Sequence, residues 1–149
     1  MTSRSPQDLA PLTSETLIEE RVLSLIGRAS HRQIWFLFVD RDSVQLPLLV
    51  PLDNHPLTPA KDDIPRVAGF LTQVADMAEA AGVVIVLERY GGARLTPSDL
   101  TWARLVHQAA AVASLGLRGI LLSHATGVRW VAPDDYLVGG GGDLREEWR

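Results

Sequence analysis

Residues 83–87 (VVIVL) form an unbroken run of apolar, mostly β-branched side chains, and this run constrains the fold more than any other feature. A strand with one wet face alternates apolar and polar residues, whereas a strand covered on both faces is apolar throughout. Sheets of α/β proteins are covered in this way by helices on both faces. The run therefore predicts the central strand of an α/β domain.

Apolar runs on either side of this strand predict the rest of the sheet. Residues 33–39 (QIWFLFV) and 44–50 (VQLPLLV) flank the turn-forming sequence DRDS, a pattern typical of a β-hairpin. Pro47 cannot donate a hydrogen bond to a neighbouring strand, so the second strand is expected at an edge of the sheet or with a bulge. Two short strands, 117–123 and 128–132, are expected near the end of the domain.

Two segments before the central strand have the apolar spacing of helices. One follows Ser14, a good N-cap residue, and runs to about Gly27. The other has its apolar face over residues 67–81 and is expected to end at Gly82, because glycine adopts the left-handed conformation common at helix ends.

Residues 96–99 (TPSD) predict the start of a third helix. Thr96 serves as N-cap, Pro97 as the first helical residue, and Asp99 lies near the positive end of the helix. The helix is expected to run to about residue 115 and to stop at Gly116. Three residues are expected on its polar face: Thr101, Arg104 and Gln108.

These elements together predict one α/β domain with the order α-β-β-α-β-α-β-β. The expected architecture is a mixed sheet of about five strands with helices packed on it in a three-layer-like arrangement. The domain spans residues 14–138. Residues 1–13, rich in Ser, Thr, Pro and Gln, are expected to form a flexible N-terminal arm, and residues 139–149 a glycine-rich linker and C-terminal tail.

Composition excludes several classes of function. The net charge of −4 and the pI near 5.5, without a basic stripe, argue against nucleic acid as a partner. The absence of cysteine excludes disulfides, cysteine-ligated zinc and a thiol nucleophile. No apolar run approaches the roughly 18 residues needed to span a membrane, and the N-terminus lacks the pattern of a signal peptide, so a cytoplasmic location is expected.

Three segments resemble one known family. They are the strand 83–87, the helix start 96–98 (TPS) and the later strand 121–124 (LLSH). With the order of the elements, they resemble the RadC-type branch of the JAB (MPN, JAMM) metalloprotease-like fold over residues 33–136, with the cytidine-deaminase-like architecture as a relative. The chain also resembles small actinobacterial proteins, a resemblance that implies no mechanism.

The zinc site that this resemblance implies lacks its ligands here. The family's two His positions fall on Glu88 and Tyr90, and its Asp position falls on Thr101. The family's catalytic Glu falls on the second strand of the hairpin, where residues 48–50 are apolar. Zinc needs converging N, O or S donors at about 2.0 to 2.3 Å, and Tyr and Thr are poor ligands. The resemblance therefore implies a pseudoenzyme without catalytic residues, metal or cofactor.

In such a fold, four polar residues would line a small cleft at the end of the central strand: Glu88, Tyr90, Thr101 and His124. Two of them also have purely structural explanations. Glu88 could pair with Arg89 or Arg94 at the surface, and His124 could be a hydrogen-bonded residue at a strand end. The sequence leaves both alternatives open.

Other reactive side chains have simpler explanations. Helix capping accounts for Ser98 better than a nucleophile does, because no Gly-x-Ser-x-Gly turn surrounds it. His31 and His55 are expected in solvated loops, and His107 is expected to be partly buried in the third helix.

Two tryptophans are candidates for contact with a partner. Trp102 lies on the less apolar side of the third helix, and an exposed Trp there would anchor an interface, although core packing is the alternative. Trp148, beyond four glycines, would dock on a neighbour or belong to a disordered tail.

The sequence thus predicts a catalytically inactive JAB-like domain that acts through protein contacts, with an unidentified protein or a second copy of the chain as partner. The alternative is a small-molecule-binding domain, or a metal-independent enzyme, that uses a cleft near Glu88 and His124.

Overall fold

A computed structural model describes residues 11–27, 29–53 and 55–138. In chain order its elements are α2 (Glu15–Leu25), β1 (Gln33–Val39), β2 (Gln45–Asp53), α3 (Asp63–Ala78), β3 (Gly82–Glu88), α4 (Pro97–Val112), β4 (Gly116–His124), β5 (Gly127–Trp130) and the π-helix η1 (Asp134–Val138). The predicted α/β class, the mixed sheet and the order of the main elements are confirmed.

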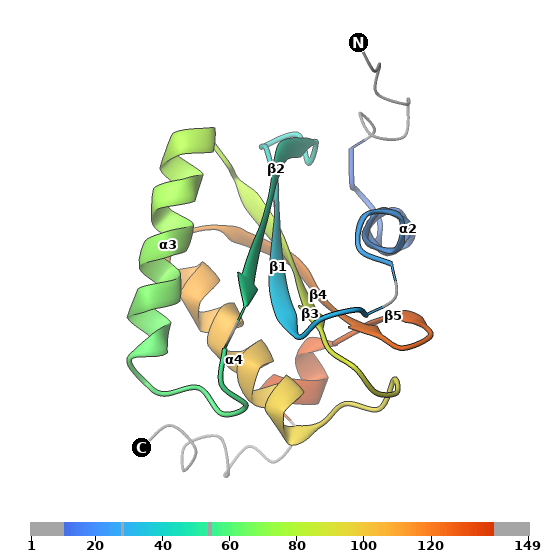
Figure 1. Ribbon diagram of the computed structural model, residues 1–149. Coiled ribbons are helices and arrows are strands. Elements are labelled where there is room, and N and C mark those ends of the chain that lie inside the picture. The colour runs from blue at the N-terminus through green and yellow to red at the C-terminus, as the bar shows by residue number, and fades with distance from the viewer. Residues whose placement is uncertain (1–10, 28, 54, 139–149) are drawn as a thin grey trace.

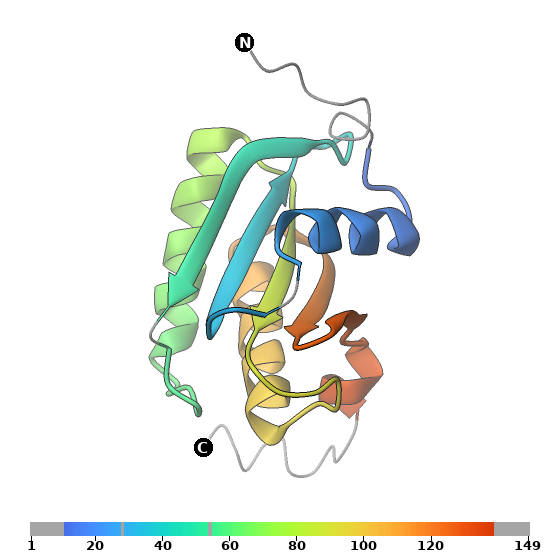
Figure 2. The same cartoon turned by 45° about the vertical axis from the view of Figure 1, so that its right-hand side comes forward.

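The five strands form one sheet in the order β2-β1-β3-β4-β5. β3 pairs parallel with β4, while the other neighbours pair antiparallel. Helices α3 and α4 lie side by side on one face of the sheet, and α2 lies on the other (Figures 1 and 2). No helix in the described part of the chain is both long and apolar enough to cross a membrane.

The central strand β3 is buried at every residue. Its alternate side chains enter two separate cores: Val83, Ile85 and Leu87 pack on the α3 and α4 side, and Val84 and Val86 on the α2 side. Because successive strand residues point to opposite faces, a strand between two helical layers needs apolar residues throughout. This explains the unbroken run at 83–87.

The residues that precede α2 belong to this layer together with the helix itself. Ser14 caps α2 through its hydroxyl, which accepts from the Leu17 N–H at 3.2 Å. Leu12 is buried, and its N–H donates to the Ser43 carbonyl at 2.8 Å. The predicted flexible arm 1–13 therefore does not include Leu12, because its side chain is buried and its N–H is hydrogen-bonded. Residues 1–10 and the predicted tail 139–149 lie outside the described residues.

The two glycines predicted to end helices instead begin strands. Helix α3 ends at Ala78, and the left-handed residue after it is Glu79, with φ of 56°. At Gly82 a Cβ atom would lie 2.9 Å from the Gly116 carbonyl oxygen, so glycine is needed for the close approach of β3 and β4. Helix α4 likewise ends before Gly116, with Ser114 in the left-handed region.

The hairpin strand β2 lies at the edge of the sheet, as Pro47 predicted. It is longer than expected and carries a second proline, Pro51. An edge position tolerates both, because the outer side of an edge strand has no neighbour that needs an N–H donor.

Arg104 is not on an exposed polar face. It is 5% exposed, and its guanidinium donates to the Tyr136 carbonyl and to the Thr101 hydroxyl, each at 3.4 Å. The cause is η1, which packs against α4 and covers the side of the helix that the sequence marked as solvent-facing.

Candidate functional site

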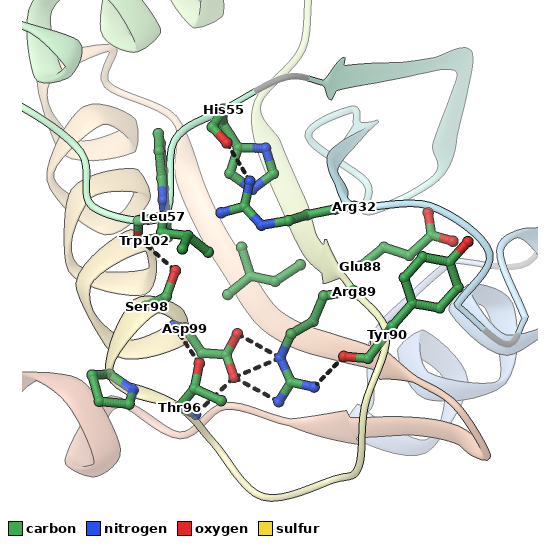
Figure 3. A pocket seen from close by; sticks show the side chains of 12 residues that line it. Arg32, His55, Leu57, Glu88, Arg89, Tyr90, Thr96, Ser98, Asp99 and Trp102 are labelled. Atoms are coloured by element: carbon green, nitrogen blue, oxygen red, sulfur yellow. Dashed lines mark hydrogen bonds and ion pairs between the residues drawn. The ribbon is translucent and has the colours of Figure 1, made fainter.

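A cleft of about 410 Å³ opens where β3 ends, between the N-terminus of α4, the residues that follow β2, and the residue that precedes β1 (Figure 3). It is called the Arg32 cleft here, and it is lined by Arg32, His55, Leu57, Leu87, Glu88, Arg89, Tyr90, Thr96, Pro97, Ser98, Asp99 and Trp102. Ligands of α/β sheets commonly bind outside the carboxyl ends of parallel strands, and the cleft lies at this end of β3.

Glu88 borders the cleft, but its carboxylate is engaged elsewhere. Its Oε2 accepts from the N–H groups of Ser30 and His31 at 2.7 and 3.2 Å, and from the Ser30 hydroxyl at 3.3 Å. Its Oε1 accepts from the side chains of Gln33 and Trp35, both at 2.8 Å. Figure 3 shows the carboxylate on the Tyr90 side, away from Asp99. Neither Arg89 nor Arg94 pairs with it, so the expected surface ion pair is wrong.

These bonds decide the protonation of Glu88, which is 3% exposed. Burial alone would raise its pKa, but the donors from Ser30, Trp35, Gln33 and His31 together hold the pKa below its ordinary value. A carboxylate that accepts this many bonds is ionised and has no free lone pair for a substrate proton. Glu88 therefore joins the loop before β1 to the end of β3.

Arg89 and Asp99 neutralise each other at the bottom of the cleft. The guanidinium Nε lies 2.9 and 3.0 Å from the two Asp99 oxygens, and Nη2 lies 2.8 Å from Oδ2. Asp99 also accepts from the Thr96 N–H at 2.8 Å, while the Thr96 hydroxyl accepts from the Asp99 N–H at 3.1 Å. The predicted helix start is thus a full capping box with a bidentate ion pair on it.

The four residues predicted to line one cleft do not meet in it. Glu88 and Tyr90 border the Arg32 cleft, whereas Thr101 and His124 are not among its lining residues. The Thr101 hydroxyl donates to the Pro97 carbonyl at 2.8 Å, within its own helix. His124 is 6% exposed, and its Nδ1 accepts from the Thr126 N–H at 3.3 Å, as the structural alternative predicted.

Trp102 and His55 form one wall of the cleft. Trp102 is 3% exposed, which agrees with the core alternative, and its indole N–H donates to the Pro56 carbonyl at 2.8 Å. The His55 ring meets the indole edge-on, with centroids 4.9 Å apart. His55 is not the solvated loop residue that the sequence predicted, since its Nδ1 is buried without a partner. The other tryptophan proposed to contact a partner, Trp148, lies outside the described residues.

Burial lowers the pKa of His55 to about 4, with a further lowering by the nearby Arg32 guanidinium. The imidazole is therefore neutral at pH 7. A histidine with this pKa is a weak general base, because effective bases have a pKa near the working pH.

Arg32 is the residue that sequence reasoning missed. Its Nη1 donates to the His55 carbonyl, and its Nη2 donates to the Pro56 carbonyl at 2.9 Å. It makes no ion pair with any residue that the structure describes. Burial lowers the pKa of Arg32 and the charge on Asp99 raises it, but a guanidinium stays protonated in proteins. No motif marks Arg32, because its setting depends on the loop after β2.

No three His, Asp or Glu side chains within the described ranges lie close enough together to hold a metal ion. The side chains of Glu88, Tyr90 and Thr101, where the sequence resemblance placed zinc-ligand positions, bind protein groups. In comparisons with known proteins, the chain matches no protein-family model and no curated protein.

Proposed function

We propose that this domain binds a small organic anion, a carboxylate or a phosphate, in the Arg32 cleft and performs no chemistry on it. The observation that carries the proposal is the Arg32 guanidinium, a cation in a partly enclosed cleft without a carboxylate partner among the described residues. A guanidinium has five N–H donors, and two of them bind carbonyls, which leaves three for a ligand.

The local charges support an anion. The two carboxylates that line the cleft, Glu88 and Asp99, are held by backbone donors and by Arg89, so neither turns to Arg32. A cation partly withdrawn from water without a carboxylate to balance its charge costs free energy, and an anionic ligand would recover part of that cost. The apolar lining, which includes Leu57, Leu87 and Pro97, suits an apolar body attached to the anionic group.

The polar groups of the cleft support binding without catalysis. The Ser98 hydroxyl donates to the Leu57 carbonyl at 2.5 Å, and it forms no hydrogen bond with a basic side chain in the described part of the chain. His55 is neutral, and its Nδ1 has no hydrogen-bond partner among the described residues that would orient the ring. An activated nucleophile requires a base, and a base requires an orienting group. The JAB-type relation, the contact-making role and the cytoplasmic location stay predictions of the sequence.

Titration with simple probes tests this function. Benzoate and inorganic phosphate are added to the full chain, with neutral benzamide as the uncharged match of benzoate, and the NMR signal of the Trp102 indole N–H reports on the cleft. We expect a saturable shift with at least one anion and none with benzamide.

Two variants assign the site. Arg32→Met removes the cation and is expected to abolish the shift, whereas Arg41→Met, at the exposed turn between β1 and β2, leaves it intact. Equal responses to benzoate and benzamide, or a response that survives in a folded Arg32→Met variant, would overturn the proposal.

A further inference from the structure

We infer that the anion bound at Arg32 is the C-terminal carboxylate of a partner polypeptide whose last residue is apolar. This inference rests on the proposed anion-binding function and names its ligand. The juxtaposition that carries it is a guanidinium inside the cleft, without a carboxylate partner among the described residues, and exposed apolar side chains, Leu57 and Tyr90, at the cleft's rim.

The rim exposes apolar surface that the fold does not use. Leu57 is 67% exposed and Tyr90 is 68% exposed. Figure 3 shows them on opposite sides of Arg89 and Asp99. A free small acid would touch only the floor of the cleft, whereas a chain that leaves the cleft crosses the rim. Aromatic residues at such positions are typical of protein interfaces.

Both rim residues are anchored to the fold. The Tyr90 hydroxyl donates to the Ser30 carbonyl, and the Leu57 carbonyl accepts from the Ser98 hydroxyl at 2.5 Å. A surface held in place before binding loses less conformational entropy when a partner docks. The rim is therefore already arranged for contact in the free protein.

The free edge of Arg32 selects a carboxylate. Its two terminal nitrogens donate to the successive carbonyls of His55 and Pro56, so three donors remain, Nε–H and one N–H on each terminal nitrogen. Nε–H and the parallel Nη–H beside it match the two oxygens of one carboxylate. Asp99 already pairs with Arg89, so Arg32 offers a single positive charge, which matches a singly charged carboxylate better than a doubly charged phosphate.

The shape of the cleft favours a chain end over an acidic side chain within a chain. At about 410 Å³ the cleft is near the small end of ligand sites, and the wall of His55 and Trp102 closes one side. A terminal residue carries its carboxylate and its side chain on one Cα, so the carboxylate reaches Arg32 while an apolar side chain meets Leu87 and Pro97.

Two peptide pools test the inference. The full chain is immobilised and equilibrated with random hexapeptides that carry a free C-terminal carboxylate, and separately with the same hexapeptides as C-terminal amides. Mass spectrometry of the retained peptides is expected to show free acids with an apolar last residue and no amides. Retention of amides, including those with an internal Glu, would overturn the inference.

Affinities of the retained peptides then separate a chain end from a small acid. We expect the double variant Leu57→Ser/Tyr90→Ser to bind the best peptide about tenfold more weakly, because two apolar contacts are lost, and to weaken benzoate binding by a clearly smaller factor. Leu23→Ser, on the exposed side of α2, is the control and is expected to have no effect.

N-acetyl-leucine provides the deciding comparison. If it binds as tightly as the best hexapeptide, the rim contributes nothing and the inference is wrong, while the anion-binding function stands. If benzoate, N-acetyl-leucine and inorganic phosphate all fail to bind, the proposed function itself is wrong.

Discussion

Replacing Glu88 with Gln keeps the size of the side chain but removes its charge and one acceptor atom. In the protein its two oxygens receive five hydrogen bonds, three on Oε2 and two on Oε1. A glutamine turns one oxygen into an NH₂ group that faces donors. If that group lies at Oε1, Gln33 can rotate its amide to accept, but the Trp35 indole N–H cannot and is left unpaired.

The magnitude follows from these contacts. An unsatisfied buried donor costs about 1 to 3 kcal/mol, and bonds to a charged acceptor are worth more than bonds to a neutral one. Removal of one partner from a buried charged network costs about 3 to 5 kcal/mol in total. We therefore expect Glu88→Gln to lower the free energy of unfolding at pH 7 by about 3 kcal/mol or more.

The loss of unfolding free energy in Glu88→Gln is expected to depend on pH. The pKa of Glu88 is lower in the folded protein than its ordinary value of 4.5. Its ionisation therefore stabilises the fold fully above about pH 4.5, and this stability is lost as the pH falls through the folded pKa. The difference between wild type and variant is expected to be largest at pH 7 and to narrow in acid.

Urea unfolding followed by tryptophan fluorescence, repeated between pH 7 and pH 3, measures this difference. Glu20→Gln, on the exposed side of α2, is the matched control and is expected to change the unfolding free energy by less than about 0.5 kcal/mol. A Glu88→Gln variant as stable as wild type at pH 7, or a deficit that stays constant down to pH 3, would refute the role assigned to this carboxylate.

Three other substitutions test single features of the fold by urea unfolding. Gly119→Ala places a Cβ atom 2.2 Å from a ring carbon of Trp130, so we expect a loss of about 1 to 3 kcal/mol and a changed near-ultraviolet spectrum; an unchanged spectrum would argue against this ring position. Tyr136→Phe removes the hydroxyl 3.0 Å from Nδ1 of His107 and is expected to cost about 1 kcal/mol; a neutral result would mean that solvent replaces this bond. Thr96→Ala removes the N-cap of α4 and is expected to cost about 1 kcal/mol, recovered largely by Thr96→Ser; failure of serine to restore stability would exclude capping as the cause.

Local signals located the elements of the fold because they depend on neighbours in the chain. The run at 83–87 required cover on both faces, and the two layers of helices provide it. Thr96 and Asp99 are three residues apart, so their capping box could be read directly. Pro47 restricted its strand to an edge or a bulge, because proline lacks an N–H wherever it lies, and β2 takes the edge position.

The same reasoning failed where a residue's surroundings come from a distant segment. Helical spacing predicted that Arg104 lies on a polar face, but η1 covers this residue. The same spacing made Trp102 a candidate for an exposed anchor, although the Pro56 carbonyl and the His55 ring contact its indole. No spacing rule relates Arg32 to the loop 23 residues later that receives its hydrogen bonds.

The sequence by itself determined the α/β class, the covered central strand and the start of α4. Only the tertiary structure decided that Glu88 is a structural anion and that Arg32 has no carboxylate partner among the described residues. The physical reason is register: β1 and β3 pair so that Gln33 lies opposite Glu88, and this brings donors from 53 to 58 residues away onto one carboxylate. Backbone preferences act over a few residues, whereas the partner of a charge is chosen by which strands and loops meet in space.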